Sequence, residues 1–148
     1  MKPEVDVVLR SMMTKLLVEV APAIGDAYVR SNVESMVALL AAAAEEFDRA
    51  AEVRVAENRS MRAILRAAAV QVPDGDLRAR LALAAEESDP SLRIADLNAS
   101  NDRLRALLIE LQALVEGSDE GWAREIDGAI WAELRASARR RAISFYPF

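Results

Sequence analysis

Apolar residues recur every three or four positions along most of the chain, which is the spacing of one face of an α-helix. The longest such stripe keeps a mean step of about 3.6 residues without a change of phase. It comprises Val29, Val33, Met36, Leu40, Ala44, Phe47, Ala51, Val55, Asn58, Met61, Leu65, Ala68 and Val72. No glycine or proline interrupts it before Pro73. This pattern predicts one long helix over about 26–70, with Asp26 as its N-cap, and a break near Asn58-Arg59-Ser60 is the alternative.

Shorter stripes and turn signals predict four more helices. The chain changes direction at Ala21-Pro22 with Gly25, at Pro73-Asp74-Gly75-Asp76, at Ser88-Asp89-Pro90 and at Gly117. The predicted ranges are 4–20, 77–87, 91–116 with Ser91 as cap, and 118–141. The sequence therefore predicts an all-α protein, an antiparallel bundle of four to five helices in a single domain over 1–148, with a non-helical tail at 143–148.

In the last predicted helix, four residues spaced by four define the face that we expect to point inward. They are Trp122, Ile126, Ile130 and Leu134. Alanine is frequent on the stripes of all the helices, which allows close approach between neighbours.

The chain of 148 residues contains no histidine and no cysteine. This excludes disulfides, thiolate nucleophiles, imidazole bases and the zinc, haem or iron–sulfur sites that need those ligands. Gly-rich phosphate-binding motifs are also absent from the sequence. The remaining reactive side chains are carboxylates, arginines, two lysines, hydroxyls and amides, so the composition favours a non-enzymatic protein without a cofactor.

The formal net charge is −5 and the sequence pI is about 4.9. An acidic chain disfavours nucleic acid or an anionic membrane as the main partner. The N-terminal residues carry charges where a secretory signal needs an apolar stretch, and the longest apolar run, 36–44, is too short to cross a membrane. We therefore expect the protein in the cytoplasm.

Two segments share the pattern A-x-N-x-x-φ-R-A-φ-L, where φ is apolar. Their polar positions are Asn58 and Arg62 in one, and Asn101 and Arg105 in the other. Chance or helical convergence explains the echo better than a duplication does. An asparagine on a buried stripe needs a polar partner. The favoured interpretation is that the two amides pair across the core or lie at an exposed end. The alternative is a ligand-binding pocket where amides and guanidinium groups hold an anion.

Two i,i+3 carboxylate pairs are the candidate metal ligands, Glu45 with Asp48 and Glu86 with Asp89. Such pairs project from adjacent positions and can hold Mg²⁺. Their convergence would indicate a Mg²⁺-dependent hydrolase of nucleotide-like small molecules, although the E-x-x-E motif of all-helical pyrophosphohydrolases is missing. Solvated acidic faces are the favoured interpretation.

Three of the seven aromatic residues, Phe145, Tyr146 and Phe148, lie in the last four positions. Large apolar rings at a chain end favour burial, either by folding back on the same bundle or by docking into a neighbouring chain. The two alternatives are nearly equal on sequence grounds.

Some elements resemble an uncharacterised all-helical bacterial family. They are Leu17-x-Glu19-Val20-x-Pro22-Ala23, the segment from Tyr28 to Asn32 entering a long helix, Leu97-Asn98, and the aromatic-proline tail. The resemblance implies a small companion protein, often encoded beside aminoglycoside-phosphotransferase-like kinases and acyl-CoA dehydrogenases. The segment from about Val53 to Asp96 is longer than in that family, and the family implies no catalytic residues.

Taken together, the pattern and the composition predict a non-enzymatic helical protein. We expect it to act by self-association into a homo-oligomer or by binding a companion protein.

Overall fold

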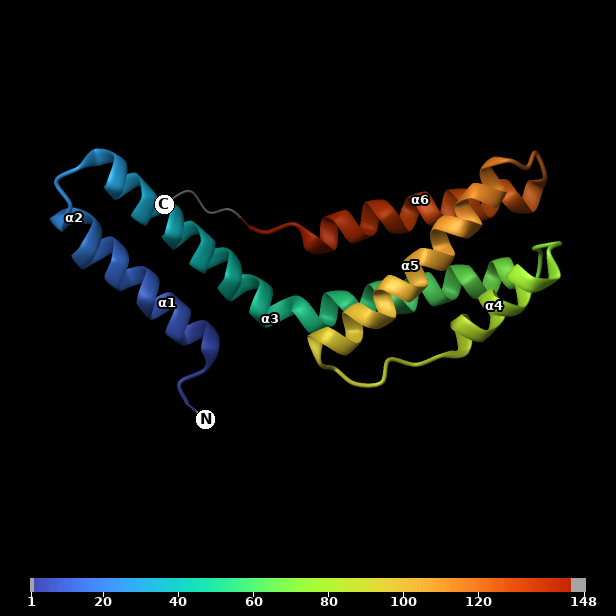
Figure 1. Ribbon diagram of the computed structural model, residues 1–148, viewed down its shortest axis with the longest axis horizontal. Coiled ribbons are helices and arrows are strands. Elements are labelled where there is room, and N and C mark those ends of the chain that lie inside the picture. Colours follow the sequence, from blue (N-terminus) through green and yellow to red (C-terminus); the bar gives the residue numbers. More distant parts are fainter. Residues whose placement is uncertain (1, 145–148) are drawn as a thin grey trace. The chain divides into compact units, whose positions relative to one another are not determined.

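The computed structural model describes residues 2–144, and within them the chain forms helices and connecting loops without a strand (Figure 1). The predicted all-α fold is confirmed. The elements are α1 (Val5–Lys15), a π-helical segment (Leu16–Val20), α2 (Ala21–Ala23), α3 (Ala27–Ala69), α4 (Gly75–Glu86), α5 (Ile94–Glu116) and α6 (Gly121–Arg141).

The long helix α3 is continuous over 43 residues, as its unbroken stripe predicts. Asp26 caps its N-terminus, because its Oδ1 accepts the backbone N–H groups of Tyr28 at 2.8 Å and Val29 at 3.0 Å. The alternative break near Asn58 is wrong. The Asn58 side chain is fully buried and hydrogen-bonds to other segments, so it does not compete for the backbone of its own helix.

The first helical segment continues past its predicted end at Ala21-Pro22. The π-helical segment leads directly into α2, and Ile24, which follows α2, adopts an extended conformation. Pro22 lies in the first turn of α2, where the missing N–H of a proline is tolerated. A proline that resembles a stop signal therefore stands at a helical junction.

Contacts divide the described chain into two compact units. Unit 1 comprises residues 2–50 with 143–144, and unit 2 comprises Ala51–Ala142. Helix α3 contributes its first part to unit 1 and its second part to unit 2. The single-domain prediction stays a prediction.

Unit 2 contains the main hydrophobic core, built from the second part of α3 and from α4, α5 and α6. Fully buried side chains from each of these helices contribute to it, among them Leu65, Leu81, Leu111 and Ile130. The turn before α4 begins the helix at Gly75, two residues earlier than predicted, because the Asp74 carboxylate accepts the N–H groups of Asp76 and Leu77.

Two predicted details of unit 2 are wrong. Helix α5 starts at Ile94 with Arg93 in the N-cap position, while Ser91 accepts the Arg93 N–H at 3.0 Å and donates to the Asp96 carboxylate at 2.6 Å. The predicted inward position of Leu134 on α6 is also wrong, because this side chain is exposed. Ile126 and Ile130 are buried as predicted, and Trp122 is partly buried against the core. The other buried positions of α6 are Ala123, Glu133 and Ser137.

Unit 1 is a hairpin in which α1 and α2 run back beside the first part of α3 (Figure 1). Helix α1 contains no buried residue. The buried apolar residues of this unit are Ala21, Val33, Val37, Ala44 and Ala50. Among the described residues, no helix has both the length and the apolar character needed to cross a membrane.

Candidate functional site

The two asparagines of the sequence echo meet in the core of unit 2. Asn58 of α3 and Asn101 of α5 are 0% and 4% exposed, and Asn101 Nδ2 donates to Asn58 Oδ1 at 2.8 Å. Asn58 Nδ2 donates in turn to the Leu97 carbonyl at 3.2 Å. The amides therefore pair across the bundle, as the favoured interpretation of the sequence expects, and they join α3 to α5.

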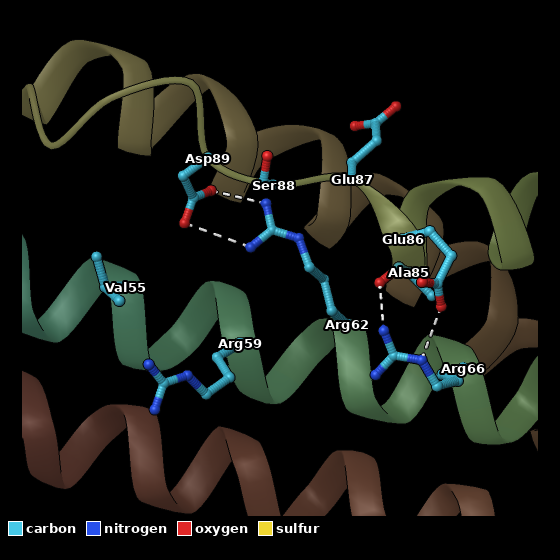
Figure 2. Close-up of a pocket in the computed structure, with 9 residues that line it drawn as sticks. All are labelled: Val55, Arg59, Arg62, Arg66, Ala85, Glu86, Glu87, Ser88 and Asp89. Carbon is cyan, nitrogen blue, oxygen red and sulfur yellow. Dashed lines mark hydrogen bonds and ion pairs between the residues drawn. The ribbon is translucent and has the colours of Figure 1, made fainter.

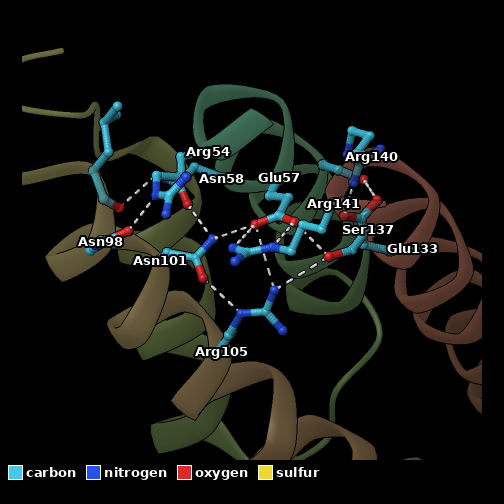
Figure 3. Close-up of polar contacts among 12 residues, drawn as sticks. Arg54, Glu57, Asn58, Asn98, Asn101, Arg105, Glu133, Ser137, Arg140 and Arg141 are labelled. Carbon is cyan, nitrogen blue, oxygen red and sulfur yellow. Dashed lines mark hydrogen bonds and ion pairs between the residues drawn. The ribbon is translucent and has the colours of Figure 1, made fainter. Parts of the chain in front are cut away.

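Each asparagine shares a carboxylate with the arginine four residues after it, and Figure 3 shows this arrangement around Asn101. Around Asn101, the carboxylate is that of Glu57: Asn101 Nδ2 lies 3.3 Å from Glu57 Oε2, and an Arg105 nitrogen lies 3.6 Å from the same oxygen. Arg105 also donates to Asn101 Oδ1 at 2.7 Å. The echo thus corresponds to a repeated chemical unit of amide, guanidinium and carboxylate.

Around Asn58, the shared carboxylate is that of Asp89, in the loop after α4. Asn58 Nδ2 donates to Asp89 Oδ1 at 3.0 Å, and Arg62 donates to the two carboxylate oxygens at 2.7 and 3.3 Å. Both Arg62 and Asp89 are largely buried, with 12% and 13% of their side chains exposed. This pair holds the loop that links α4 to α5 against α3.

The carboxylate of Glu57 is the centre of the network, and its side chain is fully buried. Arg141, at the end of α6, donates to Oε1 at 2.7 Å and to Oε2 at 2.6 Å. Ser137 donates to Oε1 at 2.5 Å. Glu57 therefore links α3, α5 and α6 through charge-assisted hydrogen bonds, which are about twice as strong as neutral ones.

The surroundings of these carboxylates favour their charged forms. Burial alone would raise the pKa of Glu57, but the hydrogen bonds from Arg141 and Ser137 and the charges of Arg141 and Arg105 outweigh it and lower the pKa from 4.5 to about 2. Burial also opposes the shift at Asp89, where hydrogen bonds from Arg62 and Asn58 lower the pKa. Both groups are thus anions at neutral pH.

Three buried polar residues of the network were not predicted from the sequence, namely Glu57, Glu133 and Ser137. Glu133 accepts a hydrogen bond from Ser60 at 2.5 Å and forms an ion pair with Arg140. The sequence does contain a signal for two of them. Glu133 follows Ile130 by three residues and Ser137 follows Glu133 by four, which places both on the buried face of α6 with Ile126 and Ile130.

The anion-pocket hypothesis requires free guanidinium groups, and the structure shows partners for both. Arg62 binds Asp89 and Arg105 pairs with Glu57. A pocket of about 320 Å³ does border Arg59, Arg62 and Arg66, but Glu86, Glu87 and Asp89 line it as well (Figure 2). With three acidic and three basic side chains, this pocket has no net positive charge to attract an anion, and the hypothesis stays a prediction.

The candidate metal ligands divide between the two units. In unit 1, Glu45 pairs with Arg49 and also accepts the Ser144 backbone N–H, while Asp48 is exposed. In unit 2, Glu86 pairs with Arg66 and Asp89 with Arg62. Within residues 2–144, no three acidic side chains lie close enough together to hold a metal ion. The Mg²⁺ hypothesis therefore stays a prediction.

The three aromatic residues of the tail, Phe145, Tyr146 and Phe148, lie outside the described residues. Their burial, in the same chain or in a neighbouring one, stays a prediction.

The lowered pKa of Glu57 predicts a loss of stability in acid. A carboxylate whose pKa is lower in the folded state stabilises the fold above its unfolded pKa, near 4.5, and this contribution disappears as the pH falls towards about 2. Between about pH 6 and about pH 3, we expect Glu57 alone to account for a loss of about 2 kcal/mol. Urea unfolding at both values, for the wild type and for Glu57→Gln, measures it. A variant with the same acid sensitivity as the wild type would contradict the assignment.

The comparisons with known proteins found nothing similar to this chain: no protein-family model, no curated protein and no solved structure matches it. The resemblance to the uncharacterised bacterial family therefore stays a prediction.

Proposed function

We propose that this protein is a helical protein-binding module without catalytic activity, which acts through self-association or through a companion protein. The observation that carries the proposal is the apolar surface of unit 1. Of the nineteen exposed large hydrophobic residues in the described chain, eleven lie between Val5 and Phe47, about a third of the sequence. Exposed apolar residues at this density are typical of a surface that another protein covers.

The chemistry of the chain supports the same proposal. No histidine or cysteine is present, so imidazole bases and thiolate nucleophiles are missing. The buried carboxylates Glu57 and Asp89 bind arginines of the same unit, which gives them a structural role. Polar groups in a helical core fix which helix positions face each other, so the network gives unit 2 a specific packing.

The size of the protein in extracts of its native cells tests the proposal. We expect the chain to elute in an assembly clearly larger than its own 16.2 kDa, at its natural abundance. The variant Met36→Glu places a single charge in the apolar surface. Its elution should shift to the size of one chain, because an unpaired charge buried in an interface costs several kcal/mol of binding free energy. Elution of the wild type as a single chain would contradict the proposal.

A matched control is Leu83→Glu, which introduces the same charge at an exposed leucine of α4 in unit 2. Leu83 is 69% exposed, against 55% for Met36. This variant should keep the size of the wild-type assembly. Dissociation by both variants would show a general effect of charge and would contradict a binding surface confined to unit 1.

A further inference from the structure

Six of the exposed large apolar residues of unit 1 lie on one side of the hairpin. Successive residues of an α-helix are rotated by about 100° around its axis. On α3, this rotation places the exposed residues Val29, Met36 and Phe47 in one row, to one side of the buried residues Val33 and Val37. On α1, Val5, Val8 and Met12 are exposed and lie to the same rotational side of the partly buried residues Leu9 and Met13. Because the two helices are antiparallel, these two sets of residues lie on the same side of the hairpin. We call these six residues the hairpin face.

The hairpin face has a spacing suited to helix packing. On α3, Val29, Met36 and Ala43 are seven residues apart, and Val33, Leu40 and Phe47 fill the intervening positions of the heptad. A seven-residue repeat of this kind places side chains along a seam that faces other helices. The seam is only partly covered inside unit 1: Val33 is buried, but Met36 and Phe47 are each 55% exposed.

Two helices alone enclose only a small core, and in unit 1 it consists of one buried residue before α3 and four on α3. Helix α1 buries none of its residues, although Val5, Val8, Leu9, Met12 and Met13 make its sequence apolar. When two antiparallel hairpins pack face to face as a four-helix bundle, the apolar face of each hairpin is buried by the other. A partner with the same shape and the same apolar face therefore completes the unit.

The charges of the hairpin face are compatible with its own copy. A face that meets itself brings equal charges together, so any net charge there would repel. The α3 arc of the face contains Val29, Asn32, Met36, Leu39, Ala43 and Phe47, none of which is charged. On the same side of α1 and of the π-helical segment that follows it, the charged residues are Lys15 and Glu19. They form a neutral ion pair, with Lys15 Nζ 3.7 Å from Glu19 Oε2.

The size of the face is near the lower end of what a stable dimer requires. The helical run from Val5 to Ala23 is about 27 Å long at 1.5 Å per residue, and two adjacent helices are about 20 Å wide, so the face covers roughly 550 Å² in projection. The accessible area of a ridged surface exceeds its projection. It therefore approaches the roughly 800 Å² per partner of standard stable interfaces.

We propose that a second copy of this chain covers the hairpin face, with the two unit 1 hairpins packed about a two-fold axis as a four-helix bundle. This inference rests on the proposed function and names the partner. Met12 lies near the middle of the face on α1, and Met36 lies near its middle on α3. A two-fold axis that crosses both helices at this level passes close to both residues. Each methionine then faces the same methionine of the other copy.

Light scattering on the purified full-length chain tests the inference. The wild type should have twice the mass of one 16.2 kDa chain at micromolar concentration. Met36→Glu should be a monomer with an unchanged helical circular dichroism signal, and Leu83→Glu should remain a dimer. A purified wild type that is monomeric, while native extracts still contain the larger assembly, overturns the second copy but leaves the proposed function intact. Monomers in both preparations overturn both.

The absence of cysteine makes a second, independent test simple. In single-cysteine variants every disulfide must join two chains. Met36→Cys and Met12→Cys should form covalent dimers under mild oxidation at dilute concentration, since each lies near the axis, and Leu83→Cys in unit 2 should not. A dimer that is not linked at Met12 or Met36, or one that links equally well at Leu83, overturns the face-to-face arrangement.

Discussion

Replacing Leu111 with alanine is expected to destabilise unit 2 by about 3 kcal/mol. Leu111 is 0% exposed and belongs to the core cluster formed by α3, α4, α5 and α6. The substitution removes buried apolar surface and leaves a cavity that the surrounding helices fill only in part, and both effects lower the free energy of unfolding. Urea unfolding followed by tryptophan fluorescence measures it, because Trp122 and Trp131 both lie in α6 and report on unit 2.

The matched control is Leu83→Ala, the same substitution on α4 at a side chain that is 69% exposed. Because little buried surface is lost at this position, Leu83→Ala should lower the free energy of unfolding by no more than about 0.5 kcal/mol. Equal effects of the two substitutions would show that Leu111 does not lie in the packed core.

The long helix was predictable because a single physical rule decides it. One apolar stripe keeps its phase from Val29 to Val72, and no helix breaker lies within it, so the sequence contains everything needed to assign α3. The first helical segment shows the limit of that rule. Pro22 is a stop signal in most local contexts, but a π-helical segment before it and a first-turn position in α2 accommodate it. That accommodation depends on the conformation of neighbouring residues, which composition does not reveal.

The polar network was predictable in part. Asn58 and Asn101 are detectable because an amide interrupts an otherwise apolar stripe, and the pairing of the two follows from the need to satisfy buried polar groups. Their carboxylate partners were not found, because glutamate and aspartate are the commonest residues of solvated helical faces. Glu57 lies beside the stripe of α3. Partners far away in the sequence, among them Ser137 and Arg141, keep its buried carboxylate ionised. Long-range proximity of this kind is a property of the packed bundle.

The outward surface of unit 1 shows a third limit. The stripe of α3 predicts burial at Met36 and Phe47 as firmly as at Val33, yet the first two are exposed in the single chain. The hydrophobic pattern gives which residues favour burial, but not whether the same chain or a second one covers them. The second copy that we propose on the hairpin face would reconcile the pattern with the observed exposure. Unit 2 would then be the specifically packed part of the chain, and unit 1 the part that associates.

The Glu57 carboxylate gives the most direct test of that specific packing. We expect Glu57→Gln to lower the free energy of unfolding by about 3 kcal/mol at neutral pH. The substitution keeps the size of the side chain but replaces one acceptor oxygen by an N–H donor, in a site where Arg141, Arg105, Ser137 and Asn101 all direct donors at it. The cost comes from buried donors without an acceptor and from guanidinium groups that have lost their counter-charge.

Glu86→Gln is the control, because the same change is made at another ion-paired glutamate. The side chains of Glu86 and its partner Arg66 are 72% and 57% exposed, so water replaces the lost interaction and the cost should stay below about 1 kcal/mol. Combining Glu57→Gln with Arg141→Met should cost less than the sum of the two single changes, since both remove the same pair. Strict additivity, or equal effects at Glu57 and Glu86, would contradict the role of Glu57 as the buried link between α3, α5 and α6.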